Sequence, residues 1–166
     1  MKIHIRSAEK KDYEELLPLF RQVHEFHVSV RPDLYKENPI PVEQEFFENQ
    51  LKDSRQHIFV AVVDRELAGV IVTKEEEVAE NSFVKARKIL LINSLCVAET
   101  HRSRGIGRKL TQYVFDKARG LEVDSVELGV SEKNTSAISF YESLGMTTKS
   151  RKMEITLKDE GEVCCE

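Results

Sequence analysis

An almost entirely apolar run, Ile89 to Val97, leads into a short basic loop with two glycines and then into a helical pattern. Such a run is typical of a strand buried in the middle of a sheet. The loop reads Arg102-Ser-Arg-Gly-Ile-Gly107, and apolar residues at helical spacing continue from Ile106 to Ala118. A buried strand, a tight loop and a helix in this order predict an α/β fold.

The loop has the composition of an anion site. A helix N-terminus offers unpaired N–H groups and a partial positive charge, which attract phosphate. Gly105 and Gly107 allow a close approach of the backbone and can adopt positive φ. The surrounding cationic side chains are Arg102, Arg104, Arg108 and Lys109. The dinucleotide and Walker patterns are absent, and a tight loop with a solvated basic face explains the same residues equally well.

The remaining patterns supply further strands and helices. We expect strands at Ile3–Ser7, Ile58–Val63, Leu67–Thr73, Val126–Val130 and Thr147–Leu157. We expect helices at Lys10–Val28, Val42–Leu51 and Ser136–Leu144, with Pro18 kinking or delaying the first. Residues 32–41 and Glu75–Lys85 are expected loops. The order βααβββαβαβ predicts a mixed sheet with helices on both faces.

The bulk composition sets limits on the class of protein. The 166 residues fit one domain, expected over residues 1–158, followed by a disordered acidic tail over 159–166. The net charge of −4, and a basic cluster without interleaved aromatic residues, argue against nucleic-acid binding. No apolar run could span a bilayer and no signal peptide opens the chain. Three cysteines do not form a disulfide framework, so we expect a reduced, cytoplasmic protein. We expect Cys164 and Cys165 to belong to a frayed end of the chain rather than to a metal or lipid site.

The sequence resembles the GNAT superfamily of acetyl-CoA-dependent N-acyltransferases. Its signature, Arg/Gln-x-x-Gly-x-Gly/Ala, is met by Arg102, Gly105 and Gly107. A second block, Asn-x-x-Ala-x-x-Phe/Leu-Tyr-x-x-x-Gly-Phe, is matched from Asn134 to Met146. The two blocks follow one another in the family's order and at its usual separation. The resemblance implies a mostly antiparallel sheet of six to seven strands, and it weakens in the N-terminal third, where substrate recognition varies.

The resemblance implies roles for individual residues. Main-chain groups of Leu95, Cys96 and Val97 would pair with the pantetheine arm of acetyl-CoA as an added strand. Asn134 would contact the cofactor, and Tyr141 would protonate the departing thiolate. No metal is implied. The pyrophosphate would be held by the backbone of Arg102, Ser103, Arg104, Gly105, Ile106, Gly107 and Arg108.

The reaction is the attack of a neutral amine on a thioester, so a base is also needed. An alkyl amine with a pKa of ~10.4 is only about one part in a thousand neutral near pH 7.4. Where many relatives carry a glutamate, this chain has Gly129. Glu127 lies on the same strand face and could act as the base, as could Glu25, His24 or His27, so the residues do not assign this role to one of them. Asn93 occupies a place where relatives often carry an acidic residue.

Two rival interpretations remain open. The first is an enzyme that acetylates a small-molecule or peptide amine directly, with Cys96 as a small buried hydrophobe and not a nucleophile. His27, Asp33 and Tyr35 could contact that amine. The second is a non-catalytic acyl-CoA-binding sensor that has lost its base. No membrane partner is expected, whereas a homodimer is implied by analogy, with the alternating run Met153–Leu157 as an edge that could pair.

Overall fold

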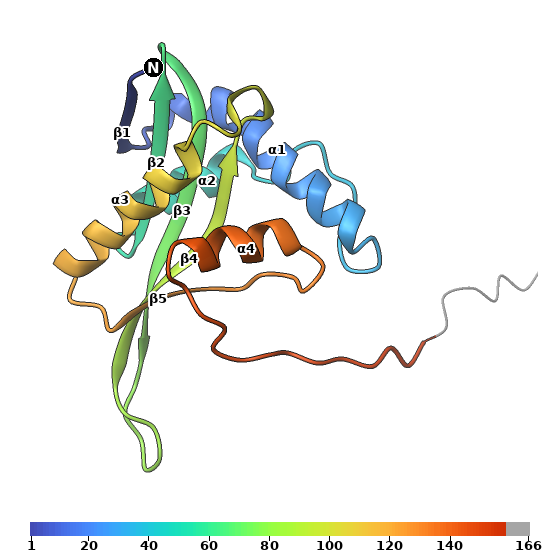
Figure 1. Cartoon of the computed structure of the whole chain (residues 1–166), viewed down its shortest axis with the longest axis vertical. Helices are drawn as coiled ribbons and strands as arrows, with labels where there is room; N and C mark the ends of the chain where they lie inside the picture. Colours follow the sequence, from blue (N-terminus) through green and yellow to red (C-terminus); the bar gives the residue numbers. More distant parts are fainter. Residues whose placement is uncertain (159–166) are drawn as a thin grey trace, which may run out of the picture.

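The computed structural model describes residues 1–158 and contains one five-stranded sheet (Figure 1). The strands lie side by side in chain order, the first four antiparallel and the last parallel to its neighbour. They are β1 (Ile3–Ser7), β2 (Gln56–Val63), β3 (Glu66–Val78), β4 (Arg87–Val97) and β5 (Ser125–Leu128).

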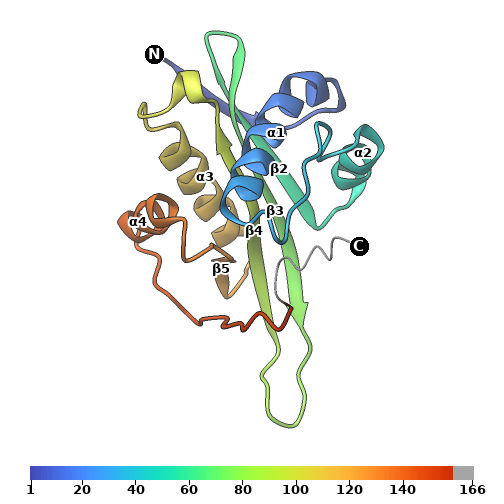
Figure 2. The ribbon, with the colours of Figure 1, turned by 90° about the vertical axis from the view of Figure 1, so that its right-hand side faces the viewer.

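Helices cover both faces of the sheet, with α1 and α2 on one side and α3 and α4 on the other (Figure 2). The α-helices are α1 (Tyr13–Val30), α2 (Gln44–Lys52), α3 (Ile106–Gly120) and α4 (Thr135–Ser143). Two short 3-10 turns, η1 (Lys10–Asp12) and η2 (Glu99–His101), precede α1 and α3. Pro18 lies near the start of α1, is exposed and does not interrupt the helix. The expected mixed α/β sheet with helices on both faces is confirmed.

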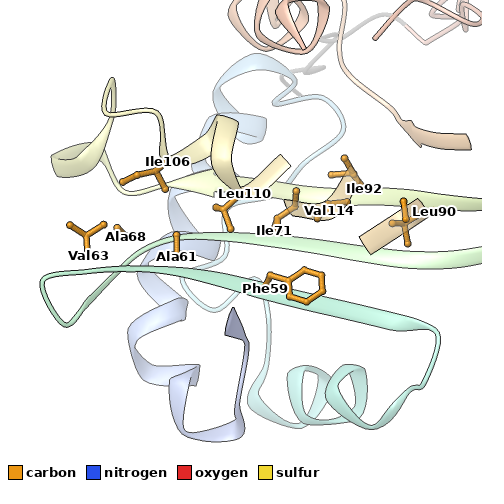
Figure 3. Close-up of a cluster of buried hydrophobic side chains, with 11 residues drawn as sticks. Phe59, Ala61, Val63, Ala68, Ile71, Leu90, Ile92, Ile106, Leu110 and Val114 are labelled. Carbon is orange, nitrogen blue, oxygen red and sulfur yellow. The ribbon is translucent and has the colours of Figure 1, made fainter. Parts of the chain in front are cut away.

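Two hydrophobic cores follow from the alternation of side chains along the strands. The cluster drawn in Figure 3 packs α3 against one face of the sheet, with Phe59, Ile71 and Leu110 among its members. On the other face, Val60 and Val70 pack with residues of α1 and α2. Neighbouring residues of one strand therefore belong to different cores.

The sheet opens between β4 and β5. Their parallel pairing ends where Ile92 faces Leu128, although β4 continues to Val97. At the same point the register between β3 and β4 shifts, so that Asn93 has no partner across β3. Beyond this bulge, one edge of β4 is free of any strand within the described residues.

The expected count of six to seven strands is wrong for residues 1–158, which form five. The strand expected at Thr147–Leu157 is absent, and this segment has no regular secondary structure. Alternation shows that a segment could pair, but it does not supply a partner edge. The loop expected at Glu75–Lys85 is also shorter, because β3 extends to Val78 in a long hairpin with β4. The expectations for residues 159–166, Cys164 and Cys165 included, lie outside the described residues.

No helix in the described part of the chain is both long enough and apolar enough to cross a membrane.

Candidate functional site

The free edge of β4 presents unpaired backbone groups. The N–H of Ala98 donates to the carbonyl of Ala68 on β3 at 2.9 Å. In an antiparallel pair a residue's N–H and C=O point to the same side, and successive residues alternate. Cys96 therefore points its backbone groups toward β3, while Leu95 and Val97 point theirs into the gap. These groups can pair with a ligand that lies along β4 like a strand.

Gln22 of α1 forms hydrogen bonds with the C-terminal end of β4 and the residues that follow it. Its Nε2 donates to the Val97 carbonyl at 2.9 Å and to the Cys96 Sγ at 3.2 Å. Its Oε1 accepts from the N–H of Glu99 at 3.2 Å. The Val97 carbonyl keeps a second lone pair for a ligand. Sequence reasoning missed Gln22, since nothing in its local pattern distinguishes it from a surface glutamine.

The loop before α3 is shaped as an anion site. Gly105, the residue that caps α3, has φ 78°, and Ser103 has φ 62°, both in the left-handed region. The first hydrogen bond of the helix runs from the N–H of Lys109 to the Gly105 carbonyl at 3.0 Å. The N–H groups of residues 106–108 therefore lack helical acceptors and face outward with the positive end of the helix dipole.

Three elements meet at Gly107. A β-carbon built there would lie 3.5 Å from Phe140 Cζ of α4 and 3.6 Å from Val97 Cγ2 of β4. Arg108 adds a second link between α3 and α4, donating to the Ser143 Oγ at 2.8 Å. The structure thus brings together the β4 edge, the loop before α3 and the part of α4 that carries Phe140 and Tyr141.

Tyr141 is partly buried beside the ring of Phe140, at 5.1 Å between centroids. Burial raises the pKa of its phenol to about 12, so the group stays protonated at physiological pH. Asn134 caps α4, where its Oδ1 accepts from the N–H of Ala137 at 3.1 Å. The cap uses the oxygen of this side chain and leaves its amide nitrogen as a donor, so its contact with a cofactor stays a prediction.

Glu127 is held by cations. Lys149 and Arg87 both form ion pairs with its carboxylate, the latter at 2.7 Å, and Ser125 donates to it at 3.2 Å. The hydrogen bond from Lys149, followed by the one from Ser125 and the charge of Arg87, lowers the pKa of Glu127. Gly129, further along, is exposed and adds no functional group.

The end of α1 supplies a second group of polar side chains. The ring of His27 stacks on Tyr35 at 5.2 Å between centroids, and the Nε2 of His24 lies 2.7 Å from the Lys36 carbonyl. Burial, with a smaller effect of His24, lowers the pKa of His27, so its imidazole is neutral at physiological pH. Glu25 lies on the exposed side of the helix.

Cys96 is buried against the α1 face of the sheet. Burial raises the pKa of its thiol to about 12, which leaves essentially no thiolate at neutral pH. A thiol in this environment is a poor nucleophile. Within residues 1–158, no cluster of His, Cys, Asp and Glu could hold a metal ion.

The open β4 edge, the N-terminus of α3 and the helix that carries the partly buried Tyr141 thus lie together. The model of the acetyltransferase (GNAT) family matches residues 20–146. The chain belongs to this family. The resemblance of the two sequence blocks is thereby confirmed.

Known proteins resemble the chain over different lengths. A mutant of the BH1408 protein from Bacillus halodurans is 33% identical, with a TM-score of 0.91 over 93% of this chain and 99% of that one. Glucosamine-6-phosphate N-acetyltransferase from Arabidopsis thaliana shares the fold at 19% identity, with a TM-score of 0.66 over 95% of this chain and 100% of its own. The L-methionine sulfoximine/L-methionine sulfone acetyltransferase of Salmonella typhimurium is 29% identical over 66 residues. That match spans 40% of this chain and 39% of the relative.

Proposed function

We propose that this protein transfers the acetyl group of acetyl-CoA directly to a primary amine. The observation that carries the proposal is the unpaired β4 edge at Leu95 and Val97, which ends beside the left-handed loop that opens α3. A ligand with a strand-like amide arm and a pyrophosphate needs these two features side by side. Family membership supports acyl transfer as the reaction class.

The pantetheine arm, the pyrophosphate and the leaving thiolate of acetyl-CoA would each meet a group of matching chemistry. Backbone groups of Leu95 and Val97 would pair with the pantetheine arm, whereas those of Cys96 face β3. The N–H groups of the loop from Arg102 to Arg108 would bind the pyrophosphate, and the amide of Asn134 would donate to the cofactor. Tyr141, kept protonated by burial, would give its proton to the leaving thiolate.

The amine must lose a proton, which costs about 4 kcal/mol near neutral pH for an alkyl amine. Glu127 is one candidate base on the α1 side of the sheet, although its ion pairs lower its proton affinity. His27 is the other, since its neutral imidazole can accept a proton directly. We propose His27 as the stronger candidate for the base. Substitutions of His27 and of Glu127 compare the two candidates.

The printed name of the Salmonella relative cites two methionine derivatives, L-methionine sulfoximine and L-methionine sulfone. Amino acids therefore belong in the acceptor panel with polyamines, aminoglycosides and peptides. Incubation of the purified protein with acetyl-CoA and each acceptor should release free CoA, measured with a thiol reagent, and yield an acetylated amine by mass spectrometry. CoA release without any acetylated acceptor across the panel would contradict the proposal.

A second candidate is a non-catalytic acyl-CoA-binding module. The ion-paired state of Glu127 and the absence of a side chain at Gly129 favour it. Calorimetry and the CoA-release assay together separate the two functions. A sensor would bind acetyl-CoA in the calorimeter but release no CoA with any amine.

A further inference from the structure

The side of α1 that packs on the sheet changes from apolar to polar at the C-terminal end of the helix. Phe20 and Val23 pack into the core between α1 and the sheet. At helical spacing, the next two positions on this face are His27 and Arg31, both partly buried and both polar. Arg31 ends the helix, donating its N–H to the His27 carbonyl at 2.9 Å. An imidazole and a guanidinium therefore lie one turn apart, where apolar packing would be expected.

This end of α1 faces the same side of the sheet as Glu127. Leu90 and Ile92 of β4 point into the α3 core, so Leu91 and its cross-strand partner Glu127 point to the α1 side. The chain after α4 connects the two, because Lys149 pairs with Glu127 and Glu154 pairs with Arg31 at 2.7 Å. The five residues from Lys149 to Glu154 span at most about 18 Å when extended, so this short segment ties β5 to the end of α1 through its two ion pairs.

Arg31 binds two carboxylates. Asp33, two residues later, forms a two-pronged pair with it at 2.9 and 2.7 Å. Glu154 comes from a segment without regular structure, and its side chain is 62% exposed, against 23% for Arg31. A guanidinium has five donors, so it can hold a second carboxylate beside Asp33. The second position is taken here by a side chain that water can readily displace.

We propose that the acceptor is an amine that also carries a carboxylate, such as an α-amino acid, and that its carboxylate replaces Glu154 on Arg31. Its amino group then lies toward His27, one helical turn away, and Tyr35 forms the wall behind the imidazole. Glu154 is a tethered competitor that the acceptor displaces. This inference rests on the proposed acetyl transfer and narrows its acceptor.

Matched pairs of acceptors test the inference. The full chain is assayed for CoA release with phenylalanine against 2-phenylethylamine, and with methionine against 3-(methylthio)propylamine. We expect a kcat/KM at least about tenfold higher for the member with the carboxylate, because a charge-assisted hydrogen bond is gained. In Arg31→Gln this ratio should fall toward one.

Glu154→Gln gives an independent readout, since it keeps Arg31 and Asp33 intact. It should lower KM for the amino acid about twofold to fivefold, as expected for the loss of an exposed ion pair, and leave KM for acetyl-CoA unchanged. Arg151→Gln, which breaks the pair between Arg151 and Glu132 in the same segment, is the matched control and should leave both KM values unchanged.

Equal kcat/KM values within each pair, together with an unchanged KM in Glu154→Gln, would overturn the carboxylate site while acetyl transfer stands. Acetylation of polyamines or aminoglycosides in preference to amino acids would overturn it as well. The absence of CoA release with every acceptor would instead remove the proposed function, and this inference with it.

Discussion

Tyr141 combines two properties that a proton donor to a thiolate requires. Its helix is anchored to the β4 edge through Phe140 and Gly107, and burial raises its pKa to about 12. The phenol therefore carries its proton at neutral and mildly alkaline pH. Its position in the Asn134–Met146 block was available from the sequence, whereas its burial required the packing of α4.

Replacement of Tyr141 by Phe removes this proton and keeps the ring. We expect kcat to fall by about 10²- to 10⁴-fold, the usual contribution of a general acid, with little change in KM for acetyl-CoA. An acid must be protonated to act, so activity is lost only as pH rises through its pKa. Since that pKa is about 12, the wild type should show no decline attributable to Tyr141 between pH 7 and 10. Wild-type turnover in Tyr141→Phe would contradict the assignment.

The base is decided by comparing His27→Gln with Glu127→Gln. A base acts when deprotonated, so kcat should rise with pH through the pKa of the true base and then level off. The pKa of His27 is lowered below its usual 6.5, which places its rise in the mildly acidic range. The pKa of Glu127 is lowered below its usual 4.5, so Glu127 would give a flat profile there.

We expect His27→Gln to abolish this rise and reduce kcat by about 10²-fold or more. Glu127→Gln should keep the rise and cost less than tenfold, because it releases Lys149 and Arg87 without removing the acting group. The opposite ranking of the two variants would assign the base to β5.

At the scale of elements, the strand–loop–helix unit around α3 was predictable because all its determinants are local. The apolar run of β4, the left-handed position at Gly105 and the apolar periodicity of α3 lie within about thirty consecutive residues. The opening between β4 and β5 was not predictable, since it depends on where the pairing of Ile92 with Leu128 stops. The contact of Gln22 with Val97 depends likewise on how α1 packs over the sheet.

Gly105→Ala tests whether the left-handed loop before α3 binds the cofactor. Gly120→Ala, at the other end of α3, is its matched control. An added β-carbon meets nothing within 4 Å at either position, so any difference arises from the backbone. At Gly105, with φ 78°, the left-handed conformation costs a residue with a side chain roughly 1–2 kcal/mol. We expect a lower free energy of unfolding in urea and a higher KM for acetyl-CoA. Gly120→Ala should leave KM unchanged, and an equal rise in both variants would argue against a pyrophosphate site at the loop.

At the scale of the whole molecule, two layers of helices on a twisted sheet leave one side incomplete. β5 is a short edge strand, and all four of its residues are only partly buried. Residues 147–157, which were expected to cover this side as a strand, instead run from β5 toward α1. Ion pairs of Lys149 and Glu154 hold them there. The sequence could show that residues 147–157 alternate like a strand, but the partner of a strand is set by tertiary contacts or by a second chain.

From Met153 to Lys158, apolar side chains alternate with polar ones, and all of them are exposed. Glu154 points to Arg31, while the neighbouring odd-numbered positions are turned to solvent: Met153, Ile155 and Leu157 are 93%, 82% and 87% exposed. Burial of each such side chain is worth about 1.5–3 kcal/mol, so a row of three is costly to leave in water. We propose that a second copy of the chain covers this row.

Light scattering coupled to size exclusion should then give twice the 19.1 kDa mass of the chain. Met153→Lys combined with Ile155→Lys should shift the mass to that of a monomer, because each lysine would bury a charge in the interface. Phe83→Lys is the matched control, since Phe83 is 86% exposed but lies in the β3–β4 connection, outside the row. A wild-type monomer at all concentrations, or dissociation by Phe83→Lys alone, would place the interface elsewhere. Because the row shares its segment with Glu154, dimer formation would also fix how firmly that carboxylate is held on Arg31.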